Sequence, residues 1–300
     1  MESSGGTPRV VVVGDLLYDL LARVEGEVIF GTDTFVPIRV AAGGSGANAA
    51  AWFASSGIET HFVGRVGADS FGGFLARELE RAGVRPHLAR APSLATGKVF
   101  VLVDGAGERT MITDRGAGEA LSPEDLPGSL FRGGHLHLSG YTLSGGSRRE
   151  TAIKALRSAR RSGMSFSVDP SSIPLLRAVG PGFFLESTRG ADSCFPNLEE
   201  GALLAGSEEP ERIAETLLGY YFAVVLKLGP EGALYAGADG VRARVPASPV
   251  RVVDTTGAGD ALCAGFLSAR LSGDSPTEAL WRGVGLASRA IERVGGRPKS

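Results

Sequence analysis

The chain has 300 residues, 43% of them hydrophobic and 21% charged, which suits a globular protein with one large α/β domain or two modest ones. A formal net charge of −2 gives no indication of a nucleic acid or a membrane surface as partner. The first residues lack the pattern of a signal peptide, and no apolar run approaches the roughly 20 residues that cross a bilayer. Cys194 and Cys263 lack metal-ligand spacing and suggest no disulfide framework, so we expect a cytoplasmic protein.

The predicted elements alternate between strand and helix along the chain. Residues 9–14 (RVVVVG) form a continuous β-branched run, which predicts a buried strand of a parallel sheet. Further strands are predicted at 61–67, 135–140, 164–170, 192–195 and 222–228, and helices at 70–82, 148–162 and 281–294, with an alanine-rich helix that begins near residue 47.

Two stretches, 20–40 and 98–113, alternate apolar and polar residues without a helical period. They predict short antiparallel strands, and the second contains a glycine hairpin, DGAGE. Neither stretch can bury a core alone, so we expect the two to pair into a small sheet that lies over the main domain as a lid. Exposed edge strands are usually covered, and this favours a homodimer in which the lids pair.

The stretch 254–267, DTTGAGDALCAGFL, carries the chemistry. We expect the apolar run 250–253 to form a strand that leads through a glycine turn into a helix, and backbone N–H groups at a helix start bind anions. The small residues Gly257, Ala258 and Gly259 would let a phosphate approach the backbone. A carboxylate is unexpected at an anion site, because Asp260 would repel the phosphate. Its presence is explained if Asp260 accepts the proton of a hydroxyl that attacks the phosphate. The pattern predicts phosphoryl transfer with Asp260 as the base; an ordinary strand-to-helix turn is the alternative.

Two polar side chains are candidates for holding a hydroxyl compound. Asp19 follows the first strand, near the edge where open α/β sheets bind ligands. Asn48 lies in the first turn of the helix that follows the glycine-rich segment 43–46, where its amide can both donate and accept a hydrogen bond. The alternatives are a solvated loop residue for Asp19 and helix capping by Ser45 or Asn48.

Asn197 and Glu200 are one helical turn apart at the end of a predicted strand. A carboxylate with a nearby amide suits a hydrated magnesium ion, and a capped helix with an early glutamate is the alternative. His135 and His137 share one strand face, but no third ligand has suitable spacing, so we expect packed or exposed histidines. The arginines of the predicted helix 148–162 are interpreted as a solvated face: Arg148, Arg149, Arg157, Arg160 and Arg161.

Together these motifs resemble the ribokinase-like (PfkB-type) carbohydrate kinases. The first family signature is matched by GGSGANAA with Gly57 and Gly67 at the expected spacing, the second by DTTGAGDALCAGFL, and the Asn-x-x-Glu element by Asn197 and Glu200. The resemblance covers nearly the whole chain. It implies a single kinase domain, 1–300, with a three-layer α/β/α fold, a mostly parallel sheet of about nine strands, and a β-sheet lid from segments about 17–42 and 97–116. It also implies transfer of the γ-phosphoryl group of ATP, with magnesium, to a hydroxymethyl group.

The resemblance further implies roles for individual residues. Asp260 is the expected base, beside an anion hole of Gly257, Ala258 and Gly259. The residues expected to bind substrate hydroxyls are Asp19, Gly44 and Asn48. Those expected around magnesium and the nucleotide are Asn197, Glu200 (through water), Lys227, Gly229, Gly232, and Gly283 to Ala287 at the adenine. Asp254 and Thr256 match part of a monovalent-cation site. Potassium is left open there, because Lys299 could replace the ion or Ser300 could ligate it.

The acceptor is the least determined feature. Ribokinases carry a lysine at the position of Ser45, an acid near Gly140 and an asparagine at Leu17, so the case for ribose itself is weakened. We order the acceptors as a neutral ribose- or fructose-like sugar, then a nucleoside, then a sugar acid or phosphosugar. A nucleoside would need an aromatic slot, for which Phe30, Phe35 and Phe100 are candidates.

An acidic acceptor would need Arg115 to point into the pocket, and a position of Arg109 and Arg115 at the lid rim or a dimer contact is the alternative. Two interpretations come from other classes of protein. One is a non-catalytic sugar or nucleotide sensor, which the intact Asp260 and Glu200 disfavour. The other is a nucleotide-binding oxidoreductase, which is disfavoured because no G-x-G-x-x-G follows the first strand.

Overall fold

The computed structural model describes residues 8–298 apart from 27, 29, 30 and 106–108. Within these residues the main element is a nine-stranded sheet with the order β13-β12-β11-β10-β9-β8-β1-β4-β5. The strands from β11 to β5 run parallel, and β12 and β13 add an antiparallel edge. Their bounds are β1 Arg9–Val13, β4 Glu59–Gly67, β5 Arg85–Ala91, β8 His135–Ser139, β9 Ser165–Asp169, β10 Ser193–Cys194, β11 Ala223–Lys227, β12 Ala233–Gly237 and β13 Arg242–Val245. The expected mostly parallel sheet is confirmed.

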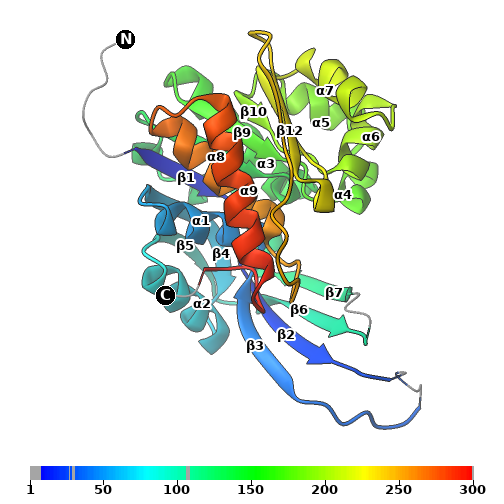
Figure 1. Ribbon diagram of the computed structural model, residues 1–300. Coiled ribbons are helices and arrows are strands. Elements are labelled where there is room, and N and C mark those ends of the chain that lie inside the picture. Colours follow the sequence, from blue (N-terminus) through cyan, green and yellow to red (C-terminus); the bar gives the residue numbers. More distant parts are fainter. Residues whose placement is uncertain (1–7, 27, 29–30, 106–108, 299–300) are drawn as a thin grey trace.

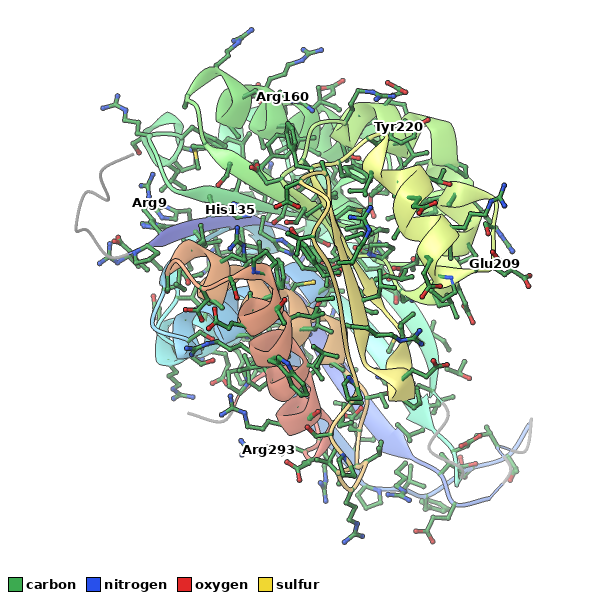
Figure 2. All side chains as sticks on the ribbon, turned by 45° about the horizontal axis from the view of Figure 1, so that its top comes forward. Arg9, His135, Arg160, Glu209, Tyr220 and Arg293 are labelled. Atoms are coloured by element: carbon green, nitrogen blue, oxygen red, sulfur yellow. The ribbon has the colours of Figure 1, made fainter. Side chains whose placement is uncertain are left out.

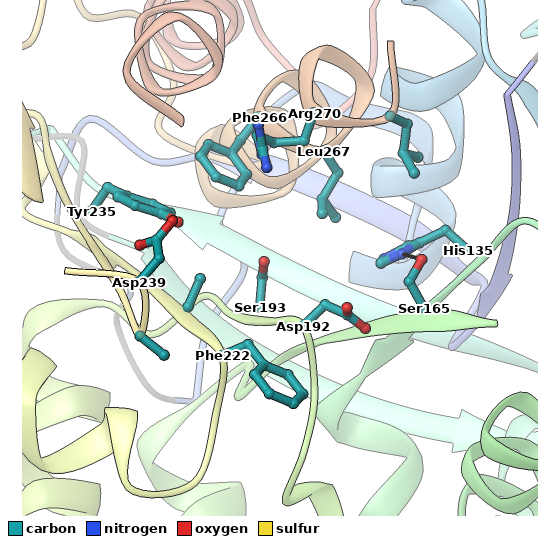
Figure 3. Close-up of a pocket in the computed structure, with 13 residues that line it drawn as sticks. His135, Ser165, Asp192, Ser193, Phe222, Tyr235, Asp239, Phe266, Leu267 and Arg270 are labelled. Carbon is teal, nitrogen blue, oxygen red and sulfur yellow. Dashed lines mark hydrogen bonds between the residues drawn. The ribbon is translucent and has the colours of Figure 1, made fainter. Parts of the chain in front are cut away.

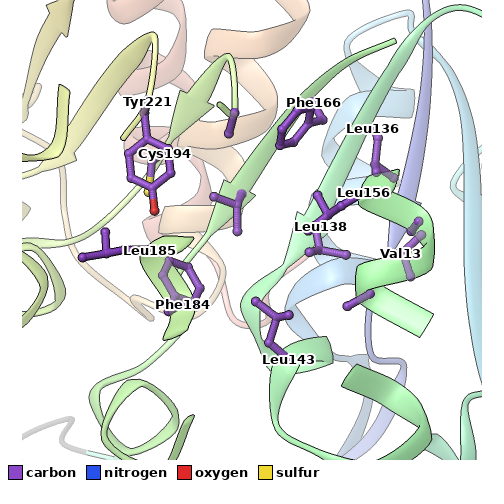
Figure 4. Packing of buried hydrophobic residues seen from close by; sticks show 14 of the residues in the cluster. Val13, Leu136, Leu138, Leu143, Leu156, Phe166, Phe184, Leu185, Cys194 and Tyr221 are labelled. Atoms are coloured by element: carbon purple, nitrogen blue, oxygen red, sulfur yellow. The ribbon is translucent and has the colours of Figure 1, made fainter. Parts of the chain in front are cut away.

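Helices cover both faces of this sheet (Figure 1). One face packs against α1 Ser45–Ser55, α2 Ser70–Arg81, α8 Ala258–Leu271 and α9 Pro276–Ile291. The other packs against α3 Gly146–Arg161, α4 Ile173–Val179, α5 Pro181–Thr188, α6 Leu198–Ala205 and α7 Pro210–Leu218. Because successive side chains of a strand point to opposite faces, Val10 and Val12 join one core while Val11 and Val13 join the other. Figure 4 shows the second core, around Leu138 and Phe184.

A second sheet of four strands extends from one end of the main sheet and forms the lid (Figure 1). Its order is β3-β2-β6-β7, with bounds β2 Leu17–Arg23, β3 Ile38–Gly43, β6 Thr96–Val103 and β7 Arg109–Gly116. Strand β2 pairs parallel with β6, and the other pairs are antiparallel. By this register, Asp19, Arg109 and Arg115 fall on one face of the lid, and Ile38, Val40, Phe100 and Ile112 on the other.

One expected strand and the expected start of one helix were wrong. Residues 250–253 form no strand, and Val252 and Val253 are 59% and 48% exposed. The backbone N–H of Val253 instead donates to the carbonyl of Ile291 at the end of α9, so the segment follows a helix end and not a sheet edge. Helix α9 begins at Pro276, before the expected 281, because Ser275 caps it in a reciprocal pair with Glu278.

The interpretation of the basic helix as fully solvated was wrong for one residue. Arg148 is only 1% exposed, and its Nη1 donates to Glu119 at 3.0 Å in the turn that follows β7, whereas Arg157, Arg160 and Arg161 are exposed. Figure 2 shows Arg160 on the outside of α3.

His135 and His137 are packed, as expected. Their rings hydrogen-bond to the hydroxyls of Ser165 and Ser167, and burial lowers the pKa of His135 to about 3 and that of His137 to about 4. Cys194 and Cys263 are buried free thiols. No helix among the described residues is both long and apolar enough to cross a membrane.

Candidate active site

Two helices, α1 and α8, begin at the same place, and no side chain caps either one. The residue before each helix is a glycine with positive φ, 94° at Gly44 and 74° at Gly257, where a side chain would also meet neighbouring backbone atoms. The Ser45 hydroxyl of α1 donates to Asp260 Oδ1 of α8 at 2.8 Å and joins the two ends. The first-turn N–H groups therefore have no side-chain partner and face the predicted anion site, although Ala47 N–H reaches the Asp15 carbonyl and Ala258 N–H the Thr255 carbonyl, each at 3.3 Å.

Asp260 lies in the first turn of α8, partly exposed at this junction. Burial raises its pKa to about 7 and the Asp169 carboxylate adds to the rise, while Ser45, Lys227 and Asn48 oppose it. A carboxylate whose pKa lies near neutrality can accept a proton and still be ionised in much of the population at pH 7, which suits a general base.

Lys227 and Asp169 form an ion pair at the carboxyl ends of β11 and β9, with 2.7 Å between Lys227 Nζ and Asp169 Oδ2. Burial opposes both charges, but their attraction outweighs it, so the pKa of Asp169 is lowered and that of Lys227 raised. A Cβ built on Gly259 would lie 3.2 Å from Lys227 Nζ, so the ammonium faces the start of α8. Sequence reasoning assigned no role to Asp169, although an acid that ends a buried parallel strand was a usable signal.

Asn197 and Glu200 form a reciprocal cap at the start of α6. Glu200 N–H donates to Asn197 Oδ1 at 2.8 Å, and Asn197 N–H donates to Glu200 Oε2 at 2.9 Å. Glu200 is 3% exposed, and burial raises its pKa while Lys227 opposes the rise. The backbones of Asn197 and Lys227 pair in a bridge, so this cap and the ion pair share one edge of the sheet. The capping alternative is therefore present, and a role toward magnesium stays a prediction.

The expected hydroxyl-binding residues lie on the lid side of the junction. Asp19 is on β2, and burial raises its pKa to about 7, against which the charge of Arg297 acts. Asn48 is buried in α1 and accepts from Arg297 Nε at 3.1 Å instead of capping the helix. Arg297 also donates from Nη2 to the Gly43 carbonyl at 2.9 Å. Arg297 could not be identified from the sequence as a neighbour of Asn48, because it belongs to no motif and lies 249 residues away.

The two lid arginines point toward the site and not to the lid rim. Arg115 Nη1 is 3.2 Å from Asp15 Oδ2, and its guanidinium lies 4.3 Å from the centre of the Tyr141 ring. Arg109 Nη2 donates to Thr255 Oγ1 at 2.8 Å, and its Nη1 donates to Thr256 Oγ1. Arg109 thus connects the lid to the loop that precedes α8.

Asp254 fixes the loop before α8. Its Oδ1 accepts from the backbone N–H of Thr256 at 2.9 Å and from the Thr256 hydroxyl at 2.6 Å, and its Oδ2 accepts from Gly295 N–H at 2.9 Å. Burial opposes its charge, but these bonds hold the pKa of Asp254 below its usual range. A monovalent cation here stays a prediction, and Lys299 and Ser300 lie outside the described residues.

The remaining nucleotide positions lie where the chain turns and where helices pack. Gly229 and Gly232 are in the turn between β11 and β12. A Cβ on Gly283 of α9 would lie 2.9 Å from the Leu262 carbonyl of α8, so close helix packing accounts for this glycine. Ala287 packs beside the same core. Contacts of these four residues with a nucleotide stay predictions.

Neither of the two described candidates forms the proposed aromatic slot for a nucleoside base. Phe35 is 91% exposed, and Phe100 lies on the lid face opposite Asp19. Phe30 lies outside the described residues.

A separate cavity of about 350 Å³ lies at the opposite end of the main sheet, where its parallel strands begin (Figure 3). Its lining includes the first residues of four strands, His135, Ser165, Ser193 and Ala223. Asp260 instead lies near the residues that end strands, such as Lys227. Phe222 and Arg270 also border the cavity (Figure 3). It is therefore distinct from the site around Asp260.

The fold and the site define a phosphotransferase that acts on a hydroxyl compound. Residues 7–300 match the model of the pfkB family carbohydrate kinases, and the chain belongs to this family. It is 31% identical over 282 residues to the ATP-dependent ribose-1-phosphate kinase of Halopiger xanaduensis, covering 91% of this chain and 88% of the relative. It is 32% identical over 272 residues to a fructokinase of Klebsiella pneumoniae, covering 87% and 83%.

Solved structures of kinases share the fold. The adenosine kinase from Sinorhizobium meliloti superposes with a TM-score of 0.90 at 28% identity, covering 98% of this chain and 96% of that one. A putative ribokinase II from E. coli, in complex with ATP and Mg²⁺, superposes with a TM-score of 0.85 at 25% identity, covering 96% and 94%. The predicted ribokinase-like fold and the prediction of a carbohydrate kinase are thereby confirmed.

The pKa values of the two site carboxylates predict a steep pH dependence. Burial raises the pKa of Asp19 and that of Asp260 to about 7, and the predicted roles, hydroxyl binding by Asp19 and proton acceptance by Asp260, both need the ionised form. With both substrates below saturation, kcat/KM should therefore fall below pH 7, with a slope that approaches two on a logarithmic scale.

The substitution Ser45→Ala removes a hydrogen bond that lowers the pKa of Asp260, so it should move the acidic limb to higher pH. Ser55→Ala at the other end of α1, where the hydroxyl donates only to the Trp52 carbonyl, should leave the limb in place. The measurement is the pH profile of kcat/KM for the three proteins. An acidic limb that is identical in Ser45→Ala and in the unmodified protein would contradict the assignment.

Proposed function

We propose that the protein transfers the γ-phosphoryl group of ATP to a hydroxymethyl group of a neutral sugar of the ribose or fructose type. One observation carries this proposal: Asp260, with a pKa of about 7, lies at the uncapped start of α8 beside the uncapped start of α1. An anion site that contains a base has an evident use in moving a phosphoryl group to a hydroxyl.

On the acceptor side, Asp19, Gly44 and Asn48 hold the sugar hydroxyls. Asp260 accepts the proton of the attacking hydroxyl while its oxygen forms a bond to the γ-phosphorus. The bond from phosphorus to the β–γ bridging oxygen breaks, and ADP leaves with that electron pair. Backbone N–H groups at Gly257, Ala258 and Gly259 stabilise the charge on the transferred group, and the lid excludes water.

On the nucleotide side, Lys227 supplies a fixed positive charge next to the start of α8. Glu200 would hold magnesium through water, with Asn197 beside it, and the ion supplies charge neutralisation on the phosphates when it is bound. No group of three or more histidine, cysteine, aspartate or glutamate side chains among the described residues could hold a metal. A hydrated ion that relies on phosphate oxygens and one carboxylate fits this donor set. We expect Gly229, Gly232, Gly283 and Ala287 around the nucleotide.

Other acceptors on the same site remain alternatives. A nucleoside is second, because the adenosine kinase from Sinorhizobium meliloti shares the fold, but Phe35 and Phe100 do not supply a slot for its base. A sugar acid or phosphosugar is third: Arg115 reaches the site, but Asp15 neutralises its charge. A non-catalytic sensor is the alternative from another class, and the intact Asp260 and Glu200 argue against it.

Asp260→Asn should lower kcat by about 10²- to 10⁴-fold, because the general base is lost, while ATP still binds. The measurement is ATP consumption with D-fructose, D-ribose, adenosine and 2-dehydro-3-deoxygluconate, together with calorimetric titration of ATP. Asp274→Asn is the matched control, since Asp274 lies in the loop before α9 and forms an ion pair with Arg282 of α9. Unchanged turnover in Asp260→Asn would contradict the base assignment. Sugar binding without ATP consumption by the unmodified protein would favour the sensor.

The potassium question has a direct test. Asp254 already accepts three hydrogen bonds and has Arg109 Nη1 at 3.6 Å, so we propose that turnover does not require a monovalent cation. ATP turnover in potassium chloride and in tetramethylammonium chloride should then differ by less than about twofold. Activation by potassium of about tenfold or more would instead support Asp254 and Thr256 as cation ligands.

The outer face of the lid supports a homodimer. Ile38, Val40 and Ile112 are 54%, 52% and 63% exposed on it, and β3 and β7 are its edge strands. We propose that two lids pair in solution, so light scattering should give twice the mass of the chain, and Ile112→Lys should give the monomer. Trp281→Lys, at an equally exposed residue of α9, is the control. A monomeric unmodified protein refutes this proposal.

A further inference from the structure

The segment 295–298 is built into the site from the far end of the described chain. The buried indole N–H of Trp52 donates to the Gly296 carbonyl at 2.9 Å, and Gly295 N–H donates to Asp254 Oδ2 at 2.9 Å. A Cβ on Gly296 would lie 2.5 Å from Asn48 Nδ2, so the segment passes directly over that amide. The backbone is thus fixed on both sides just before Arg297.

Arg297 uses only part of its guanidinium for the protein. Nε donates to Asn48 Oδ1 at 3.1 Å and Nη2 to the Gly43 carbonyl at 2.9 Å. Nη1 is inaccessible to solvent and has no hydrogen-bond partner. A solvent-inaccessible donor without a partner is costly on a charged side chain, so a partner is expected at this nitrogen.

Asp19 has an unpaired acceptor that complements this unpaired donor. Its Oδ1 is also inaccessible and without a hydrogen-bond partner. The charge of Arg297 lowers the pKa of Asp19 against the effect of burial, yet the two side chains form no hydrogen bond or direct ion pair. Two opposite charges therefore act on each other, and each side chain keeps one polar atom without a hydrogen-bond partner. The other charged groups that act on them are Asp15 and Asp254 for Asp19, and Glu78 and Asp260 for Arg297.

We propose that Arg297 binds the compound that accepts the phosphoryl group. Together with Asp19, it forms hydrogen bonds to one hydroxyl of that compound. The hydroxyl hydrogen goes to Asp19 Oδ1, and the hydroxyl oxygen accepts from Arg297 Nη1. A hydroxyl is both donor and acceptor and fits this pair, whereas Asp19 would repel a carboxylate or phosphate and Arg297 would repel an ammonium group. The inference rests on the proposed function and narrows it to an acceptor that is neutral at this position.

Arg297 also positions Asn48. Because Asn48 Oδ1 accepts from Arg297 Nε, the NH₂ group of the amide is directed elsewhere, and the Asn48 side chain lowers the pKa of Asp260. Arg297 therefore acts both on Asp19, which binds the acceptor, and, through Asn48, on Asp260, which activates the acceptor. Its loss should change both the binding of the acceptor and the titration of the base.

Arg297→Met removes the charge and the donors and keeps an unbranched side chain. It should raise KM for the acceptor by about 10- to 100-fold, the range for a hydrogen bond to a charged group, and leave KM for ATP within about twofold. The acidic limb of kcat/KM should move to higher pH, because Asp19 and Asp260 lose interactions that lower their pKa values. The acceptor is whichever of D-fructose, D-ribose and adenosine has the highest kcat/KM with the unmodified protein.

Three controls separate this role from mere anchoring. Arg293→Met changes an exposed arginine near the end of α9 (Figure 2) and should leave all these values unchanged. Trp52→Phe removes another anchor of the segment and should not move the acidic limb. Arg297→Lys keeps a charge and a donor, and should restore part of the loss and return the limb toward its original position.

The outcomes decide between this inference and the proposed function. If the unmodified protein is active and Arg297→Met matches Arg293→Met in KM and in the acidic limb, the inference is overturned. Loss of both ATP and acceptor binding, with the same result for Trp52→Phe and Arg297→Lys, also overturns it, because anchoring then explains everything. If the unmodified protein phosphorylates none of the three compounds, the proposed function fails. The inference is then judged by calorimetric titration of each compound, where equal or absent binding in both proteins overturns it.

Discussion

Two helix starts that face one another, both without side-chain caps, set the conditions for everything around them. Their N–H groups concentrate positive potential at one point. The chain places Asp260 at this point, where burial raises the carboxylate pKa to about 7. The hydrogen bond from Ser45 then joins the two helices through the base itself. The same local arrangement thus combines the two features of the proposed site, an anion site and a proton acceptor.

The charges behind this junction are balanced within the site. Lys227 is held by Asp169 and presented to the start of α8, so the cation stays ionised despite its burial. Asp169 in turn raises the pKa of Asp260. On the lid side, the charge of Arg297 acts on Asp19 without a direct ion pair, and burial still raises the pKa of Asp19 to about 7. Each side of the junction therefore combines one carboxylate and one cation, paired directly on the side of Lys227 and only near each other on the side of the lid.

Local patterns in the sequence predicted the parallel sheet, both glycine-rich helix starts and Asp260, because each of these is encoded within a few neighbouring residues. Pairings between distant segments could not be predicted in this way. Arg148 was assigned to solvent because its partner, Glu119, reaches it only through the tertiary fold. Residues 250–253 have the composition of a strand, but their backbone bonds to the end of α9. Arg297 carries no motif, and only the path of the segment over Asn48 reveals it.

The span between the contributing segments has a consequence for synthesis. Asp19 and Asn48 emerge early from a ribosome, whereas Asp260 follows more than 200 residues later, and Arg297 lies 249 residues after Asn48. Contacts over such separations form late in folding, because the intervening chain must first be ordered. A nascent chain can therefore assemble most of its sheet without an acceptor site, and the site closes only when residues 295–297 reach α1.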